Sequence, residues 1–378
     1  MFERLPSNWM IALKKVGYWI WLIPVAGIPM SYYWSLGSDH PNAWPWLVIT
    51  IVFGVIPFLD FIVGRDPANP DESDDVPFME GQGYYRFLSL MTLPLLLLML
   101  AWSGWVFVHH PDWNWVGKLG WVLSVGTVMG AIGITVSHEL IHKDPLLEQS
   151  AGGILLAAVC YAGFKVEHVR GHHVNVSTPE DASSARFGQS LYQFLPHAYK
   201  HNFLNAWNLE TQRLKRKGLP ALHWRNELVW WYALSAAMLV GFTLALGWLG
   251  GVFFLVQAAM AFTLLEIVNY VEHYGLHRRK LDNGRYERTS QAHSWNSNFL
   301  LTNLFLFHLQ RHSDHHAYAK RRYQVLRHFD DSPQLPNGYA GMIVLALFPP
   351  LWRAVMDKRV RAYYAGEEHQ LTDQQQVA

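Results

Sequence analysis

Residues 115–143 read WVGKLGWVLSVGTVMGAIGITVSHELIHK, and this stretch decides the fold. Its first part, residues 115–136, carries one charged side chain, Lys118, and is long enough to cross about 30 Å of hydrocarbon as a helix. His138 and His142 follow at once, and a continuing helix would present both imidazoles on one face because they lie four residues apart. The stretch therefore predicts a membrane span that leads directly into a histidine site.

Five further runs share this character and favour an all-α integral membrane protein with six transmembrane helices. Each run is nearly uncharged and of spanning length. Asp60 and Glu266 are the only acids in the six runs, and we expect both near cytoplasmic ends. The expected spans are residues 16–34, 43–64, 87–108, 115–136, 228–249 and 250–271.

The distribution of Lys and Arg predicts the orientation of these spans. These residues gather before the first span and after the second, fourth and sixth, whereas the short links 37–42, 109–114 and 250–251 hold none. Because positive charge marks cytoplasmic connections, both termini are expected in the cytoplasm and the chain in the inner membrane. The first run lacks a small-residue cleavage site, so we expect a retained anchor and not a signal peptide.

Composition limits the classes of protein and of site. The chain is 51% hydrophobic, and a net charge of +1 gives no basic footprint for nucleic acid. Cys160 is the only cysteine, which excludes an intrachain disulfide and Cys-x-x-Cys metal sites. We expect one catalytic domain over residues 1–364, in which the polar segments 137–227 and 272–364 form a cytoplasmic histidine-rich cap. A polar tail, 365–378, is suited to a linker.

The histidines of this cap gather in four places along the chain. Their spacings of three and four residues are those of side chains on one helical face. Nine imidazoles exceed the four to six ligands that one first-row metal ion accepts, so two ions are expected. The candidate ligands are His138 and His142; His168, His172 and His173; His273; and His312, His315 and His316.

Imidazole without thiolate suits iron, copper, zinc or nickel, so the ligand type leaves the metal open. A ligating imidazole usually donates its second ring N–H to a carboxylate or carbonyl. Several polar residues lie close enough in sequence to serve, although a solvated charge is the alternative for each acid. These candidates are Glu139, Glu167, Asp181, Asn269, Glu272 and Asp314.

Two other classes of protein remain as alternatives. The pattern from His138 to His142 also matches the zinc-protease motif, in which Glu139 would be the general base. That interpretation leaves the seven other clustered histidines without a role. A metal transporter would need polar ligands near the middle of the bilayer, and the expected spans are almost free of them.

The four motifs together resemble the membrane-bound alkane hydroxylases, within the broader group of fatty-acid desaturases, hydroxylases and xylene monooxygenases. The similarity extends from the first span to Arg327. Eight histidines are similar to the di-iron signature of the whole group, and His273 lies in a stretch that resembles an additional signature of the alkane hydroxylases. The matching stretches are HELIHK (138–143), EHVRGHH (167–173), LQRHSDHHA (309–317) through RYQ (322–324), and NYVEHYGL (269–276).

This resemblance implies two non-haem iron ions and hydroxylation of the terminal methyl group of medium- or long-chain n-alkanes to primary alcohols. It also implies dioxygen as oxidant and electrons from NAD(P)H through a rubredoxin reductase and rubredoxin. Without a Cys-x-x-Cys pair, the donor must be a separate protein or a further domain. A fatty-acid desaturase or hydroxylase is the alternative within the same chemistry.

An alkane has no polar handle, so its binding must come from apolar burial, about 0.8 kcal/mol per CH₂ group. We therefore expect an apolar slot between the spans, entered from the bilayer and ending at the metals. An acyl substrate would instead need a polar clamp for its headgroup on the cytoplasmic surface.

Overall fold

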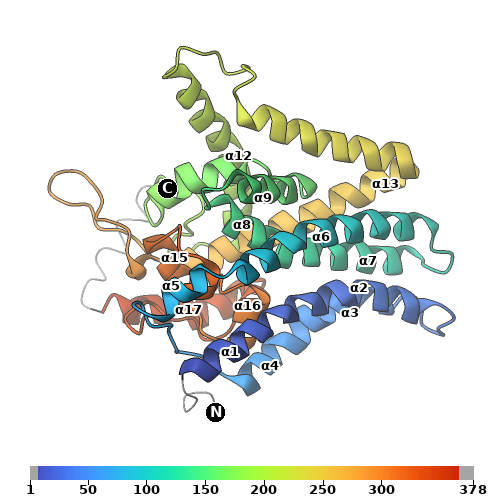
Figure 1. The fold of residues 1–378 in the computed structure, drawn as a ribbon, viewed down its shortest axis with the longest axis horizontal. Coiled ribbons are helices and arrows are strands. Elements are labelled where there is room, and N and C mark those ends of the chain that lie inside the picture. Colours follow the sequence, from blue (N-terminus) through green and yellow to red (C-terminus); the bar gives the residue numbers. More distant parts are fainter. Residues whose placement is uncertain (1–6, 366–378) are drawn as a thin grey trace.

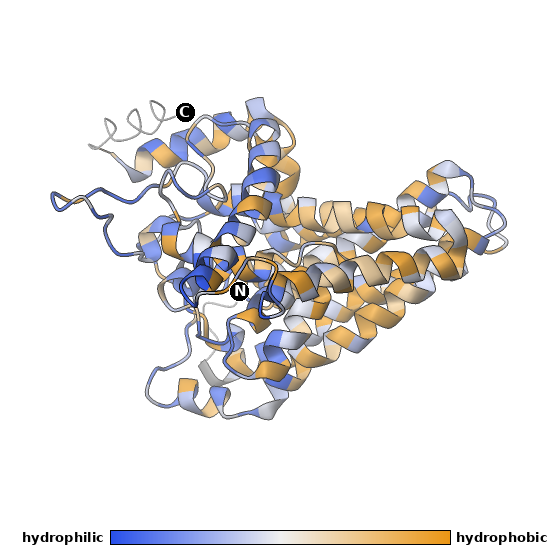
Figure 2. Ribbon diagram, turned by 90° about the horizontal axis from the view of Figure 1, so that it is seen from above, coloured by the Kyte–Doolittle hydropathy of each residue, from blue (hydrophilic) through white to orange (hydrophobic). Residues whose placement is uncertain are grey.

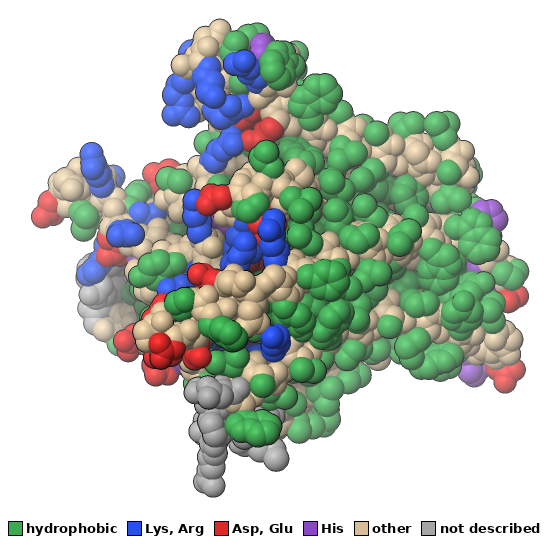
Figure 3. Space-filling model, viewed as in Figure 1, with side chains coloured by type: hydrophobic (Ala, Val, Ile, Leu, Met, Phe, Trp, Pro, Cys, Tyr) green, Lys and Arg blue, Asp and Glu red, His purple; other side chains and the backbone are tan. Residues whose placement is uncertain are grey.

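The computed structural model describes residues 7–365. These residues form helices (Figure 1), and three isolated β-bridges join other segments. Of the tail expected at residues 365–378, only residue 365 lies within the described residues. Apolar helices extend towards one end of the molecule, and the polar segments gather at the other end (Figure 2). Lys, Arg, Asp and Glu side chains lie mainly on the polar end, while apolar side chains cover the long helices (Figure 3).

Five helical stretches are long and apolar enough to cross a membrane. Large apolar side chains point outward from them: Phe61, Leu98 and Leu244 are 81%, 68% and 82% exposed. Such surfaces suit lipid, so the chain is a multi-pass membrane protein. The first four stretches comprise α1 (Ser7–Gly17), η2 (Tyr18–Trp21) and α2 (Leu22–Ser35); η3 (Trp44–Trp46), α3 (Leu47–Thr50), the π turn η4 (Ile51–Val55) and α4 (Ile56–Val63); α6 (Gly83–His109); and α7 (Trp115–Val128), the π turn η5 (Met129–Ile134) and α8 (Thr135–Ile141).

The first stretch begins earlier than residue 16, where the span was expected to start. The two lysines that suggested the boundary lie inside a helix and have partners there. Lys14 is buried and pairs with Asp66 at 2.5 Å, and Lys15 donates a hydrogen bond to the side-chain oxygen of Gln82 at 2.7 Å. Paired charges therefore extend this helix beyond its apolar part.

The fifth stretch, α13 (Glu227–His273), contains both of the last two expected spans. Its 47 residues would make a straight helix of about 70 Å, more than twice the hydrocarbon thickness. The helix is interrupted at Gly247, where φ is 71° and ψ is −173°. The ring centroids of Phe242 and Phe254 lie only 5.1 Å apart, so the chain reverses between them and α13 is a hairpin of two arms.

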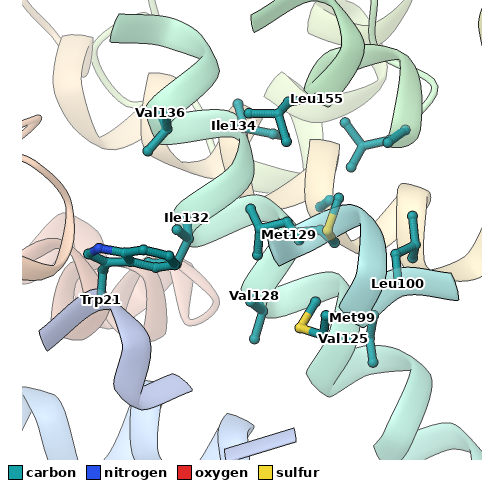
Figure 4. Close-up of a cluster of buried hydrophobic side chains, with 14 of the residues drawn as sticks. Trp21, Met99, Leu100, Val125, Val128, Met129, Ile132, Ile134, Val136 and Leu155 are labelled. Atoms are coloured by element: carbon teal, nitrogen blue, oxygen red, sulfur yellow. The ribbon is translucent and has the colours of Figure 1, made fainter. Parts of the chain in front are cut away.

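The fourth stretch packs closely against the second arm of α13 because glycines line its contact face. A Cβ atom on Gly126 would lie 2.7 Å from the backbone oxygen of Gln257, and one on Gly130 would lie 3.0 Å from that of Ala261. Small residues allow such close backbone approach between membrane helices. On the other faces of α7 and η5, buried Val125, Val128, Met129 and Ile132 join the apolar core (Figure 4).

The remaining helices lie at the polar end and hold the ends of the long helices in place. Arg311 is the central tie: its guanidinium contacts the Asp66 carboxylate at 3.3 Å and donates to the backbone oxygen of Leu326 at 2.7 Å. These helices are α5 (Asp75–Glu80), α9 (Leu146–Ala158), α10 (Phe164–Glu167), the π turn η6 (His168–His172), α11 (His173–Asn175), α12 (Leu191–Lys215), η7 (Gln291–His293), α14 (Leu300–Phe305), α15 (His312–Ala317), η8 (Tyr323–Val325), α16 (Tyr339–Ala346) and α17 (Pro349–Tyr363).

The glycine contact predicts that Gly126→Ala destabilises the protein although alanine is the better helix former. The added methyl group would overlap the backbone of α13, and such overpacking costs about 1–3 kcal/mol. Gly54→Ala is the matched control, because no heavy atom lies within 4 Å of a Cβ there. Thermal unfolding in detergent should show a lower midpoint for Gly126→Ala alone; equal midpoints would contradict the packing.

Candidate metal centre

Four separate parts of the chain bring nine histidines together where the long helices meet the polar end. The C-terminal end of the fourth stretch carries the first pair, and a π turn carries the next three. One histidine ends α13, and three lie on one short helix. The elements are α8 with His142 just beyond it, η6 with the first residue of α11, the last residue of α13, and α15.

The nine rings form two groups, and within each group one nitrogen of every ring lies within 4.8 Å of the others. One group offers five imidazole nitrogens and the other four, and each number matches the ligand number of one first-row metal ion. Group one consists of His138, His142, His168, His173 and His315, and group two of His172, His273, His312 and His316.

The spacing of the ring nitrogens fits ligands of a common ion. In group one, the Nε2 atom of His173 lies 3.0 Å from that of His168 and 3.1 Å from that of His315. In group two, the Nε2 atoms of His312 and His316 are 2.9 Å apart. Two nitrogens bound at about 2.1 Å and at right angles to each other are about 3.0 Å apart.

Three further ring nitrogens support the same interpretation. The Nε2 atoms of His138, His142 and His273 are buried and have no hydrogen-bond partner among the described residues. An unsatisfied buried polar atom costs about 1–3 kcal/mol. A cation that takes the lone pair removes this cost, so the residues present fit two metal ions.

The electrostatics of the rings beyond the spans favour metal binding as well. Burial and then the neighbouring histidines lower the pKa of His142, His168 and His315 well below the ordinary histidine value. These rings are therefore neutral near neutral pH. A neutral imidazole has the free lone pair that a metal ion requires.

The π turn explains how neighbouring histidines serve different groups. In a regular α-helix, residues five apart point about 140° away from each other. The wider π turn places His168 and His173 above one another, with their Nε2 atoms 3.0 Å apart in group one. His172 turns into group two instead. A local departure from the α-helix thus lets one segment contribute to both groups.

Asp181 holds the ring of His172. Its Oδ2 atom accepts a hydrogen bond from Nδ1 of His172 at 2.9 Å and another from the hydroxyl of Ser184 at 2.6 Å. Burial lowers the pKa of His172, but the carboxylate outweighs this effect and the net shift is upward. Because Nδ1 faces Asp181, Nε2 faces group two, which is the arrangement of a histidine ligand oriented by a carboxylate.

Glu272 lies on the metal side of group two. Its Oε2 atom is 3.1 Å from Nε2 of His312, the same nitrogen that faces His316. The hydroxyl of Tyr339 donates to the other carboxylate oxygen at 2.7 Å. Glu272 is therefore placed beside the ligand atoms, and not behind a ring as the sequence led us to expect.

An apolar cavity between the helices ends at both histidine groups. The empty space of the cavity, counted together with the solvent at its opening, is about 880 Å³. His138 and His168 of group one and His312 of group two form its polar end. Along its length it is lined by Pro24, Val52, Phe53, Ile56, Gly130, Ala131, Ile132, Ile134, Phe164, Leu264, Leu265, Val268, Phe305, Leu306, Leu309, Ala340 and Ile343, with Thr135, Asn269, Glu272, Thr302 and Tyr339 as further polar residues.

Comparison with known proteins agrees with this architecture. The model of the fatty acid desaturase family matches residues 113–346, which hold all nine histidines. The chain belongs to the fatty acid desaturase family. It is 81% identical to alkane 1-monooxygenase 2 of Pseudomonas aeruginosa, with 100% of each chain covered. It is 68% identical to alkane 1-monooxygenase 1 of that organism, over 99% of this chain and 98% of the relative.

A more distant relative is the xylene/toluene monooxygenase hydroxylase component of Pseudomonas putida. The two are 28% identical over 85% of this chain and 84% of the relative. Membership of the desaturase family removes the protease interpretation. The structure agrees, because Glu139, the acid that a protease would use as base, is buried and paired with Lys143 at 3.0 Å.

Four of the six residues that were expected to hydrogen-bond to ligand imidazoles contact other side chains or backbone groups. Glu139, Glu167, Asn269 and Asp314 are all buried near the rings. Their hydrogen-bond and ion-pair partners are not imidazoles: some lie on the same helix or turn, and others lie on a neighbouring segment. These partners are Lys143 and Tyr323 for Glu139, Asn205 for Glu167, Glu266 for Asn269, and Arg321 and Arg327 for Asp314.

Other supporting groups carry no signal in the sequence. The ring of His273 donates from Nδ1 to the backbone oxygen of His293 at 3.2 Å. Tyr339 positions Glu272 from a distant helix. Any residue type can supply a backbone oxygen, so the sequence does not mark His293 as an acceptor. A lone tyrosine outside the motifs has no diagnostic spacing either. Both contacts are therefore found only in the folded structure.

The carboxylate–histidine contact predicts that Asp181→Asn weakens metal binding by about 10- to 100-fold. The amide lacks the charge that orients and polarises the ring of His172. Chelator competition on the purified protein measures the affinity. Asp330→Asn is the control, because that side chain is 96% exposed. Unchanged affinity in Asp181→Asn would contradict this role.

Proposed function

We propose that the chain is an alkane 1-monooxygenase that hydroxylates the terminal methyl group of medium- or long-chain n-alkanes. The overall reaction is R–CH₃ + O₂ + 2e⁻ + 2H⁺ → R–CH₂OH + H₂O. The observation that carries the proposal is the apolar cavity, which ends at histidines of both groups. Support also comes from the full-length relative that bears this name at 81% identity.

Group one would hold one iron ion and group two the other. Bound iron supplies the redox chemistry that activates dioxygen. The protein's own part is to hold the rings in place: burial excludes water, and Asp181 and the backbone of His293 orient His172 and His273. Glu272 adds an oxygen donor beside group two.

The cavity binds hydrocarbon by burial, about 0.8 kcal/mol per CH₂ group, and directs one chain end to the histidines. Its length also suits a chain, since Gly130 and His138 are eight residues apart, about 12 Å along a helix. Among the described lining residues there is no Lys or Arg to hold a carboxylate or thioester headgroup. This lining favours an alkane over the fatty-acyl substrate of a desaturase.

The chain crosses the inner membrane six times, with both termini and the histidine-rich cap in the cytoplasm. The reversal at Gly247 supports the sixth crossing, because each arm of α13 is long enough to span. The links 36–43 and 110–114 at the apolar end hold no Lys or Arg, which supports the orientation. Electrons come from a rubredoxin and its NAD(P)H-dependent reductase.

Product analysis tests the substrate. The iron-loaded, chemically reduced protein is mixed with oxygenated buffer and either octane or an octanoyl thioester. We expect 1-octanol from octane, with no subterminal alcohol, because the cavity admits the chain end first. Product from the thioester alone would overturn the assignment in favour of the desaturase alternative.

Replacing His273 tests group two. His273→Ala removes one of only four rings in that group, so we expect alkane hydroxylation to fall to background and iron content to decrease. His40→Ala, an exposed histidine at the opposite end, is the control and should keep full activity. Full activity of His273→Ala with wild-type iron content would show that His273 is a packing residue and not a metal ligand.

A further inference from the structure

A strongly basic hairpin projects from the polar end of the molecule. Residues 276–290 form two antiparallel segments joined by the bridge between Lys280 and Tyr286. The backbone N–H of Glu287 donates to the oxygen of Arg279 at 2.9 Å. Five bases outnumber two acids, a balance of +3: Arg278, Arg279, Lys280, Arg285 and Arg288 against Asp282 and Glu287. We call residues 276–290 the basic hairpin.

The basic hairpin points away from the apolar helices (Figures 1 and 2). Its charges therefore face the aqueous side and not the level of lipid headgroups beside the spans. Lys280, Arg285 and Arg288 are exposed. Glu287 is engaged by Arg279 at 3.1 Å and by His293 at 3.2 Å, and Glu180 lies close to Tyr286. The outer surface of the hairpin keeps its excess of positive charge.

The base of the hairpin contacts the segment that carries group one. The guanidinium of Arg278 donates to the backbone oxygen of Val174 at 2.8 Å, directly after His173. His173 is the one member of the two groups that is not fully buried. Val174 is 60% exposed. The hairpin thus stands beside the part of the metal centre nearest to solvent.

The same base connects to group two. The backbone N–H of Arg278 donates to the oxygen of Ser177 at 2.7 Å, and the Ser177 hydroxyl donates to the oxygen of His293 at 2.9 Å. That oxygen also accepts the hydrogen bond from His273. One arginine therefore lies at the start of short hydrogen-bonded connections to both groups.

We propose that the basic hairpin, with the exposed surface at Val174, is the docking site of a small acidic one-electron carrier protein. This inference rests on the proposed function, which consumes two electrons per alcohol formed. Two reduced carriers each lose one electron at this surface, by way of His173, and solvent supplies the two protons. The oxidised carrier then dissociates.

Weak, fast encounters of this kind depend on charge. Electron-transfer complexes bury little surface, and complementary charge raises their association rates in a salt-dependent way. The hairpin supplies the positive charge, while Val174 supplies a small apolar contact.

Charge reversal tests the docking site. Lys280→Glu, Arg285→Glu and Arg288→Glu are combined in one variant. Lys215→Glu, Arg216→Glu and Lys217→Glu, which are exposed at the C-terminal end of α12, form a control of equal charge change. The probe is reduced rubredoxin of acidic sequence, and its oxidation by the iron-loaded protein in neutral nanodiscs is followed by stopped flow. We expect the second-order rate at low salt to fall roughly tenfold to a hundredfold in the hairpin variant only.

A second measurement separates docking from function. Chemically reduced protein in a single turnover with octane needs no carrier, and the hairpin variant should form as much 1-octanol as wild type. Failure of wild type in this reaction would overturn the proposed function itself. The docking site would be overturned by equal rates of carrier oxidation in wild type and the hairpin variant, or by an equal loss of this rate in the control variant. A slower rate of the hairpin variant that is seen only with anionic lipid would also overturn it.

Discussion

Two groups of closely spaced imidazoles are the constraint on which the rest of the structure depends. Nine rings from four parts of the chain bring ring nitrogens within 4.8 Å of one another in each group, and three pairs of these nitrogens are about 3 Å apart. This arrangement costs free energy unless cations join the nitrogens. Among the neighbouring polar groups, Asp181 fixes a ring and Arg311 ties a ligand-bearing segment in place. Fold and metal binding are therefore coupled energetically.

The long helices serve this centre in two ways. Their glycine contacts, such as Gly126 against α13, align helix ends that carry His138 and His273. Where these helices diverge, they leave an apolar cavity that reaches the same histidines. The polar end then covers the rings from the aqueous side and leaves His173 nearest to the surface. One centre thus faces an apolar cavity on one side and the aqueous surface on the other.

Much of this could be predicted from the sequence, because hydropathy and histidine spacing are local signals. The apolar runs indicated the spans, although Lys14, which suggested a boundary, is paired inside a helix. The four motifs indicated which histidines form the site, but not how these histidines are divided between the two groups. The π turn places His172 in group two and His173 in group one. Support from the backbone of His293 and from Tyr339 depends on tertiary contacts, which no local pattern encodes.

The count and identity of the metal ions test the central claim most directly. Elemental analysis of the protein purified from iron-replete cells, set against protein concentration from amino-acid analysis, gives both. Two groups of imidazole ligands predict two metal atoms per chain, and the proposed oxygenase function predicts that both are iron. A single metal atom per chain, or zinc in place of iron, would contradict a centre in which both groups take part in oxygen chemistry.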